Sequence, residues 1–393
     1  MRVVLFILII ISFNLYTQEI VLLTDNEITS GARQSEKYIP LLVGKNVGVI
    51  ANPTSLIGKK HLIDTLLSLK VNVKKIFSPE HGFRGQSDAG EKVNSQKDEK
   101  TGIPIISLYG SHKKPTQEDL KGIDVLVYDM QDVGVRYYTY ISTMTYCMEA
   151  AAENNVEFMV LDRPNPNGFY VDGPVLESKW KSFLGLHPVP IVYGMTCGEY
   201  ANMINDEKWL DKGNKCKLTV IPLKGYTHKI SYELPVKPSP NLPNMTAVFL
   251  YPSLGLFEGT VMSLGRGTDL PFQQIGHPEL TNGKIKFTPM PTSISKKPKY
   301  ENKVCNGFDL RNFGNEFIKS SRKIYLFWLI GSFNNLKHLT FFDENFNWHA
   351  GNSLLQEQIK AGKSEEEIRK SWENDLSAFK KIRKKYLLYD DFE

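Results

Sequence analysis

The sequence predicts an α/β protein: a Rossmann-like, doubly wound parallel sheet domain followed by a smaller α/β domain. In the first half, short apolar runs typical of buried strands alternate with stretches that have helical spacing. Between Leu234 and Pro252, recurring prolines interrupt this alternation and indicate a domain junction. With 393 residues, the chain is long enough for two hydrophobic cores.

The strands of the predicted sheet follow one another along the chain. The first, Asn46–Ala51, is followed by a helix with Leu62, Ile63, Leu66 and Leu67 on one face. The strands predicted after it are 73–78, 103–108, 124–128, 157–161 and 217–221. Two helices are also predicted, one from Ile141 to Ala152 and one that begins at Thr196 with Glu199 three residues later, a capping box. Such alternation favours parallel strands with right-handed crossovers.

We place the catalytic domain at residues 25–245 and an auxiliary domain at residues 246–393. The second domain contains a predicted strand, Tyr325–Ile330, and ends in helix. One apolar stripe runs along this terminal helix and is expected to pack into the core: Ile368, Trp372, Leu376, Phe379, Ile382 and Tyr386.

Residues 1–17 have the pattern of a signal peptide, with a basic start, a short apolar core and a polar exit. The apolar core is too short for a stable membrane-spanning helix, although an uncleaved anchor stays an alternative. No later segment approaches membrane-spanning length, so we expect an exported protein without further membrane contact.

Composition and motifs exclude several classes of function. The net charge of +5 is spread over many lysines, and the aromatic residues do not alternate with basic ones, which argues against nucleic-acid binding. The turn at residues 51–58 lacks a glycine-rich nucleotide fingerprint, and no P-loop or serine hydrolase motif occurs. We therefore expect no cofactor. The four cysteines have no zinc-binding spacing, so no metal is predicted, although His81 with Asp88 or His61 stays an alternative ligand set.

Polar side chains follow the predicted strands where each one ends. Glu80, His81 and Arg84 follow the second strand, and Asn52 follows the first. Further carboxylates stand at the ends of the fourth and fifth strands, namely Asp129, Asp132 and Asp162. With the usual strand order, the ends that carry Asn52, Glu80 and Asp129 are neighbours at the point where the winding direction reverses, which is where such sheets bind ligands.

Carboxylates beside arginines and tyrosines suit sugar chemistry. Glycoside hydrolysis needs one carboxyl that holds a proton and usually a second that acts as base or nucleophile. Burial raises the pKa of one carboxyl, while a nearby arginine keeps another ionised. The alternative for each carboxylate is a helix cap or a structural ion pair.

Seven motifs in order resemble the exo-β-N-acetylmuramidase family. They are Asn52-Pro-Thr-Ser55, Ser78-Pro-Glu-His-Gly-Phe-Arg-Gly85, Tyr128-Asp-Met-Gln-Asp-Val-Gly-Val-Arg-Tyr-Tyr-Thr-Tyr140, Leu161-Asp-Arg-Pro-Asn-Pro-Asn-Gly168, Pro238-Ser-Pro-Asn-Leu-Pro243, Phe257-Glu-Gly-Thr260 and Gly265-Arg-Gly-Thr268. The resemblance extends from about residue 30 to the end of the chain. It implies an exported enzyme that releases N-acetylmuramic acid from the non-reducing ends of peptidoglycan fragments.

The resemblance matches Glu80 to the family's catalytic glutamate. Asp129, Asp132 and Glu258 are the candidates for the second catalytic carboxylate. The substrate-binding residues that we predict are Asn52, His81, Arg84, Arg136, Tyr140, Asp162, Arg163 and Asn165. Muramic acid carries a lactyl carboxylate, and we expect Arg84, Arg136 or Arg163 to bind it. A different function stays open, an exported sugar-binding protein without turnover.

Overall fold

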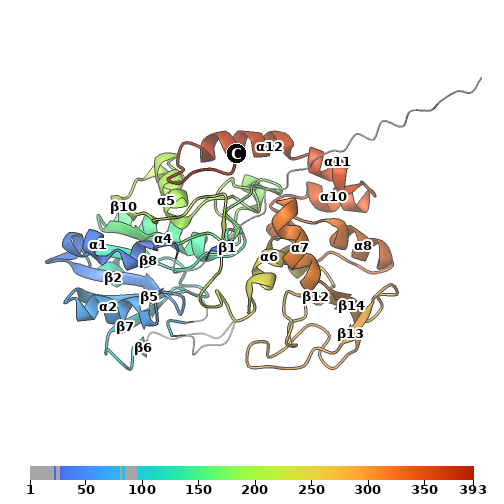
Figure 1. The fold of residues 1–393 in the computed structure, drawn as a ribbon, viewed down its shortest axis with the longest axis horizontal. Coiled ribbons are helices and arrows are strands. Elements are labelled where there is room, and N and C mark those ends of the chain that lie inside the picture. Colours follow the sequence, from blue (N-terminus) through green and yellow to red (C-terminus); the bar gives the residue numbers. More distant parts are fainter. Residues whose placement is uncertain (1–21, 24–26, 80–81, 85–95) are drawn as a thin grey trace, which may run out of the picture.

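Two parts lie side by side in the computed structural model, which describes residues 22–23, 27–79, 82–84 and 96–393. The first part, blue to green in Figure 1, contains a large sheet, and the second, yellow to red, is mostly helical.

Seven strands form the large sheet, in the order β10-β9-β8-β2-β5-β7-β6. Their bounds are β2 Asn46–Ala51, β5 Asn72–Ser78, β6 Gln96–Lys97, β7 Pro104–Ser107, β8 Val125–Asp129, β9 Glu157–Leu161 and β10 Leu218–Ile221. All neighbours are parallel except β6, which pairs antiparallel with β7 at one edge. The six parallel strands have the doubly wound order 3-2-1-4-5-6, which confirms the predicted fold class.

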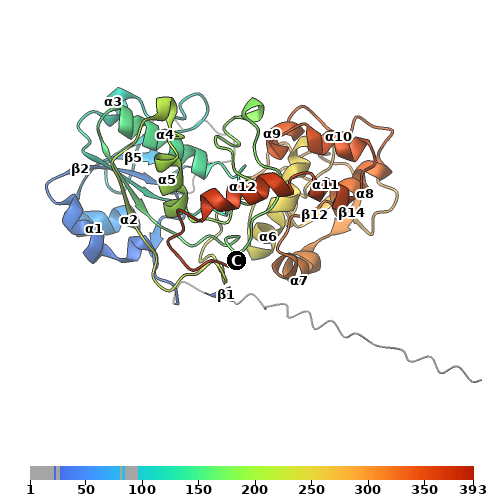
Figure 2. The ribbon, with the colours of Figure 1, turned by 90° about the horizontal axis from the view of Figure 1, so that it is seen from above.

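Both faces of the sheet are covered by helices (Figure 2). Side chains alternate along β2, so Val47 and Val49 pack with α1 Ser35–Leu42 and α2 Leu62–Ser68 on one face. Ile50 belongs to the core on the other face, under α4 Tyr140–Glu153 and α5 Cys197–Asp206. The helix predicted to begin at Thr196 is α5, and the capping box with Glu199 is present. Burial on two faces explains why the strands are continuous apolar runs.

Short elements complete the first part. They are β1 Leu22–Leu23, η1 Gly31–Arg33, β3 Leu56–Ile57, β4 Lys60–His61, α3 Gln117–Leu120, η2 Ser178–Trp180, η3 Asp211–Gly213 and β11 Ser231–Tyr232.

A three-stranded antiparallel sheet of order β12-β14-β13 organises the second part, as expected for a smaller α/β domain. Its strands are β12 Gln274–His277, β13 Ile285–Phe287 and β14 Cys305–Asp309. The helices around it are α6 Met245–Leu254, η4 Gly255–Gly259, α7 Arg311–Ser321, α8 Phe327–Asn335, α9 Phe346–Ala350 and α10 Leu354–Lys360.

The predicted strand Tyr325–Ile330 is wrong, because this stretch leads into α8. Its aromatic and branched residues suggested a strand, but the buried positions are Leu326, Leu329 and Ser332, three residues apart. That spacing places them on one face of a helix, and Phe327 points away with 62% of its surface exposed.

The terminal apolar stripe extends over two helices, α11 Glu365–Lys370 and α12 Glu373–Arg383, with Trp372 at the N-cap of α12 and Tyr386 beyond its end. Its residues belong to the main core, as predicted, with Ile368, Trp372 and Phe379 buried. Figure 2 shows α12 crossing from the second part towards the first. Residues 384–393, here called the return segment, then pack on the first part, where the backbone N–H of Leu388 donates to Glu199 Oε1 at 2.8 Å.

All four cysteines are buried and free. In the described part of the chain, no helix has both the length and the apolar character needed to cross a membrane.

Candidate active site

The strand order brings the predicted polar residues to one edge of the sheet. Asn52 follows β2, whose neighbours are β8, ending at Asp129, and β5, ending at Ser78. Asp162 follows β9, one strand further on. The predicted convergence is therefore confirmed for the described residues. Glu80 and His81, which follow β5, lie outside them.

Asp129 and Arg163 form a buried, bidentate ion pair at this edge. Arg163 Nε lies 2.5 Å from Asp129 Oδ1, and Arg163 Nη2 lies 3.0 Å from Asp129 Oδ2. Nη2 also donates to the carbonyl of Leu56 at 3.0 Å. Because each side chain neutralises the other and both are at most 5% exposed, this pair fastens β8 to the loop after β9.

Asp162 receives hydrogen bonds from four groups. Its Oδ1 accepts from the backbone N–H groups of Arg163 at 3.0 Å and Gly198 at 2.8 Å. Its Oδ2 accepts from the hydroxyls of Thr196 at 2.7 Å and Tyr389 at 2.6 Å. Burial nevertheless raises the pKa of Asp162 to about 6. Asp162 thus ties α5 and the return segment to the sheet.

Asp132 is a second buried carboxyl whose pKa burial raises to about 6. Its Oδ2 accepts from the Tyr193 hydroxyl and, at 2.6 Å, from the backbone N–H of Gly134. Its Oδ1 has no hydrogen-bond partner among the described residues. A carboxyl with this pKa holds a proton in part of the molecules near neutral pH.

Within the part of the chain that the structure describes, other buried polar atoms at this edge also have no partner. They are Asn52 Nδ2, Ser78 Oγ and Gln131 Oε1. The other polar atom of each amide is engaged: Asn52 Oδ1 accepts from the backbone N–H of Thr54 at 2.9 Å, and Gln131 Nε2 donates to the carbonyl of Asp132 at 2.8 Å. Unpartnered polar atoms of this kind are costly in a core and are typical of places where a ligand or water completes the bonding.

The three arginines expected to bind a substrate carboxylate have protein partners. Arg84 donates to both carboxylate oxygens of Asp98, at 2.8 and 3.0 Å, and to Asp64 at 3.2 Å. Arg163 is paired with Asp129, as described above. Arg136 is fully buried, and its acceptors among the described residues are the carbonyls of Pro174, Val189, His349 and Ala350.

These contacts argue against the predicted carboxylate-binding role of Arg136. Its guanidinium joins loops of the first part to α9 of the second and is closed to solvent. Asn165, also predicted to bind substrate, is similarly engaged, with Nδ2 donating to the carbonyl of Met195 at 2.8 Å and Oδ1 accepting from the backbone N–H of Asn167 at 2.8 Å.

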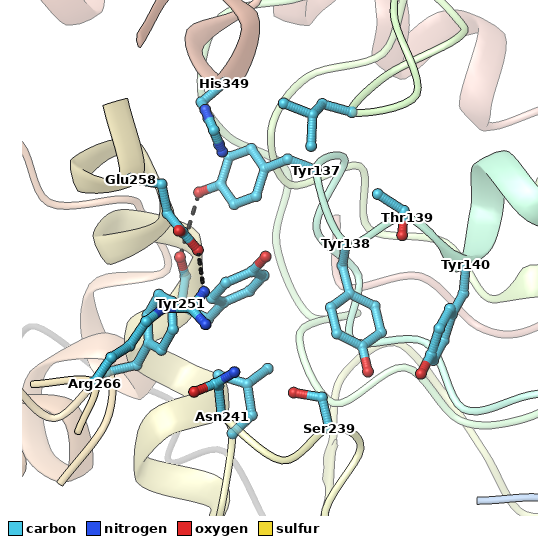
Figure 3. A pocket seen from close by; sticks show the side chains of 13 residues that line it. Tyr137, Tyr138, Thr139, Tyr140, Ser239, Asn241, Tyr251, Glu258, Arg266 and His349 are labelled. Atoms are coloured by element: carbon cyan, nitrogen blue, oxygen red, sulfur yellow. Dashed lines mark hydrogen bonds and ion pairs between the residues drawn. The ribbon is translucent and has the colours of Figure 1, made fainter. Parts of the chain in front are cut away.

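A cavity of about 240 Å³ lies where the two parts meet (Figure 3). The loop before α4 contributes tyrosines to one wall, and η4 and the following turn contribute Glu258 and Arg266 to the other. Its lining comprises Tyr137, Tyr138, Thr139, Tyr140, Leu184, Ser239, Asn241, Leu242, Tyr251, Glu258, Arg266, Phe272 and His349. Of the predicted site residues in the described chain, Tyr140 and Glu258 lie here.

Glu258 and Arg266 form an ion pair at the cavity wall, with Arg266 Nη2 lying 2.7 Å from Glu258 Oε1. About a third of each side chain is exposed, so both reach the cavity. The Arg266 guanidinium also lies over the Phe272 ring, 5.0 Å from its centroid.

The tyrosines are held by hydrogen bonds to backbone carbonyls across the junction. Tyr138 donates to Pro238 at 2.7 Å, and Tyr137 donates to Pro252 at 2.5 Å. Tyr138 and Tyr140 pack edge to face, with ring centroids 4.8 Å apart. The aromatic wall is therefore fixed before any ligand binds.

Sequence reasoning missed most of this lining. Arg266 stands in the Gly265–Thr268 motif, which was one signal that could have identified it. Asn241 likewise stands in the Pro238–Pro243 motif, whereas Tyr251 and His349 lie outside the seven motifs and come to the cavity through the packing of the two parts.

His61, one of the alternative metal ligands, caps α2 and lies 3.0 Å through Nε2 from the carbonyl of Asn52. The other two members of that set, His81 and Asp88, lie outside the described residues. Within the residues that the structure describes, no three histidine, cysteine or acidic side chains gather as a metal site would require.

Comparisons with known proteins place the chain in one family. Residues 47–246 match the model of the N-terminal domain of exo-β-N-acetylmuramidase NamZ, and residues 249–389 match that of its C-terminal domain. The peptidoglycan β-N-acetylmuramidase NamZ of Bacillus subtilis (strain 168) is 41% identical over 384 residues, which is 90% of this chain and 89% of that protein.

Two crystal structures of DUF1343 family proteins from Bacteroides fragilis NCTC 9343 have the same fold. One is 47% identical with a TM-score of 0.87, and the other is 32% identical with a TM-score of 0.79. Each match covers 93% of this chain and 99% of the other. With both family models matched in order and a relative aligned along nearly the whole length, the chain belongs to the exo-β-N-acetylmuramidase NamZ family.

Proposed function

We propose that this protein is a glycosidase that hydrolyses β-N-acetylmuramide bonds and releases N-acetylmuramic acid from the non-reducing ends of peptidoglycan fragments. Membership of the NamZ family and the activity named for the Bacillus subtilis relative support the reaction class. The structural observation that supports the proposal is the cavity between the two parts, because tyrosine rings line one wall and the carboxylate of Glu258 lines the other.

The cavity suits a single sugar residue. Tyr138, Tyr140 and Tyr251 offer ring faces and edges for the apolar side of a pyranose, and Ser239 and Asn241 offer polar groups for its hydroxyl and acetamido substituents. Its volume of about 240 Å³ lies just below the range of roughly 300–1,000 Å³ typical of small-molecule sites. A partly open cavity of this size fits one terminal sugar unit better than a long chain, which favours exo action.

Glu258 is our candidate for the second catalytic carboxylate, because among Asp129, Asp132 and Glu258 it lines the cavity. Its partner Arg266 holds the side chain in place. Glu80, matched to the family's catalytic glutamate, is the candidate acid that protonates the leaving oxygen while water supplies the hydroxyl to the anomeric carbon.

The test is turnover of 4-nitrophenyl β-N-acetylmuramide by the wild type, Glu258→Gln and Glu80→Gln. We expect each replacement to lower kcat by at least about 100-fold, since general acid–base catalysis contributes roughly 10²–10⁴-fold, with an unchanged thermal midpoint. Glu279→Gln is the matched control, because Glu279 is an exposed glutamate paired with His338.

Unchanged kcat in Glu258→Gln would remove that residue from the mechanism. If the wild type fails to turn over the glycoside but free N-acetylmuramic acid still raises its thermal midpoint, the protein binds the sugar without hydrolysing it.

We also propose that the protein is exported, on the basis of the signal-peptide pattern in residues 1–17. Cell fractionation shows where the protein is located, and the mass of the recovered chain shows whether the signal peptide has been removed. A mature chain that starts after residue 17 outside the cytoplasm is expected, and an intact cytoplasmic chain would contradict it.

A further inference from the structure

The Arg266 side chain differs from the three arginines that the sequence singled out. Arg84, Arg136 and Arg163 each have their guanidinium bound by two or more protein acceptors. Arg266 lines the cavity and makes one hydrogen bond among the described residues, from Nη2 to Glu258. Its remaining N–H groups are therefore available to a ligand.

A tight turn fixes the direction of this guanidinium. The glycines on either side, Gly265 and Gly267, have φ values of 70° and 80°, which side chains with a Cβ rarely adopt. A Cβ on Gly265 would lie 2.5 Å from the carbonyl oxygen of Leu270, and one on Gly267 would lie 2.6 Å from that of Met290. The guanidinium of Arg266 also packs over the ring of Phe272. Such a preorganised group loses little entropy when it binds.

The charges around Arg266 balance one another. Lys299 donates to the carbonyl of Thr260, two residues after Glu258. Asp343 and Glu258 favour the charged form of Lys299, and Arg266 opposes it, so two cations and two carboxylates lie near one another here. The attraction for an anionic ligand therefore comes from the N–H groups of Arg266 itself and not from an excess of positive charge.

We propose that Arg266 is the specificity residue that reads the lactyl carboxylate of muramic acid, with Glu258 on one edge of its guanidinium and the substrate carboxylate on the other. The inference rests on the proposed function and deepens it. A planar guanidinium has two edges that can each bind a carboxylate, whereas a lysine offers a point charge. Glucosamine derivatives lack this carboxylate and leave the edge without a partner.

The experiment compares affinities for free N-acetylmuramic acid and N-acetylglucosamine, measured by calorimetry on the full chain. We expect the wild type to prefer the muramic acid, and Arg266→Gln to lose about 10- to 100-fold of that preference, the range for a hydrogen bond to a charged group. Arg266→Lys should keep part of the preference. Arg311→Gln is the matched control, because Arg311 is an exposed arginine paired with Asp309 and is absent from the cavity lining.

A purely structural role for Arg266 would weaken both sugars equally and leave the ratio unchanged, which would overturn the inference. A wild type with equal affinity for the two sugars would also overturn it. Turnover of the aryl muramide, followed in parallel, reports on the proposed function separately. Turnover with an unchanged ratio in Arg266→Gln refutes only the role of Arg266, and an altered ratio without turnover refutes only the hydrolysis.

Discussion

Replacing Arg163 with methionine should destabilise the protein strongly, because it leaves Asp129 as a buried charge without a partner. The pair is bidentate, and the exposed fractions of the two side chains are 5% and 0%. Removing one partner of such a pair typically costs about 3–5 kcal/mol. The carbonyl of Leu56 also loses a donor, which adds about 1 kcal/mol. We therefore expect a loss of about 4–6 kcal/mol in the free energy of unfolding.

Urea denaturation at pH 7 measures this loss, and a double variant tests its cause. Asp129→Asn combined with Arg163→Met removes the unpaired charge and should recover at least half of the lost stability. Arg311→Met, at the exposed pair with Asp309, should cost less than about 1 kcal/mol. A loss below about 1 kcal/mol in Arg163→Met, or a double variant no more stable than the single one, would refute the reasoning.

Turnover of the double variant then separates structure from chemistry at this position. If Asp129 only holds the strand edge together, the folded double variant keeps its kcat. A folded double variant without activity would support the catalytic role first considered for Asp129.

Two further predictions concern Asp132 and the Arg266 turn. Burial raises the pKa of Asp132 from 3.8 to about 6, so the native state binds an extra proton between these values and loses stability as the pH rises through them. The free energy of unfolding of Asp132→Asn, measured by urea titration, should therefore exceed that of the wild type by about 1–3 kcal/mol at pH 7.5 and by little at pH 4. An equal gain at the two pH values would contradict the assigned pKa. Gly267→Ala should raise KM for the muramide and lower stability by about 1–3 kcal/mol, because the added Cβ meets the Met290 carbonyl oxygen. Gly58→Ala, at a similar φ of 60° with open space around it, controls for backbone strain alone, and equal effects at the two glycines would show that the contact is unimportant.

The sequence was sufficient for the parallel sheet because its strands are buried on both faces. Asn46–Ala51 and Glu157–Leu161 have the bounds that their apolar runs predicted. Local signals were also reliable where they have a local cause, as at the Thr196 capping box. Tyr325–Ile330 failed because a short aromatic run fits a strand as well as a buried helix, and the decision depends on which residues face the core.

The site was less predictable because hydrogen-bond partners come from distant parts of the chain. Arg136 was a reasonable candidate for a substrate carboxylate until the structure placed four carbonyls around it, two of them from α9. Arg266 has the same chemistry but faces a cavity formed by both parts of the molecule. No sequence pattern distinguishes these two environments, since each arginine is surrounded by glycines, aromatic residues and short turns.

The return segment has a consequence for the order of folding. Tyr389 bonds to Asp162 across 227 residues, and Leu388 bonds to Glu199 across 189. Contacts of such sequence separation form late, because the loop they close is long. The first part of the chain is synthesised before residues 384–393, so Asp162 and Glu199 bond first to nearer partners such as Thr196 and His228 and gain the return segment later. We expect a fragment that stops near residue 245 to lack the hydrogen bonds from Leu388 and Tyr389 and to leave one position on each carboxylate open to solvent.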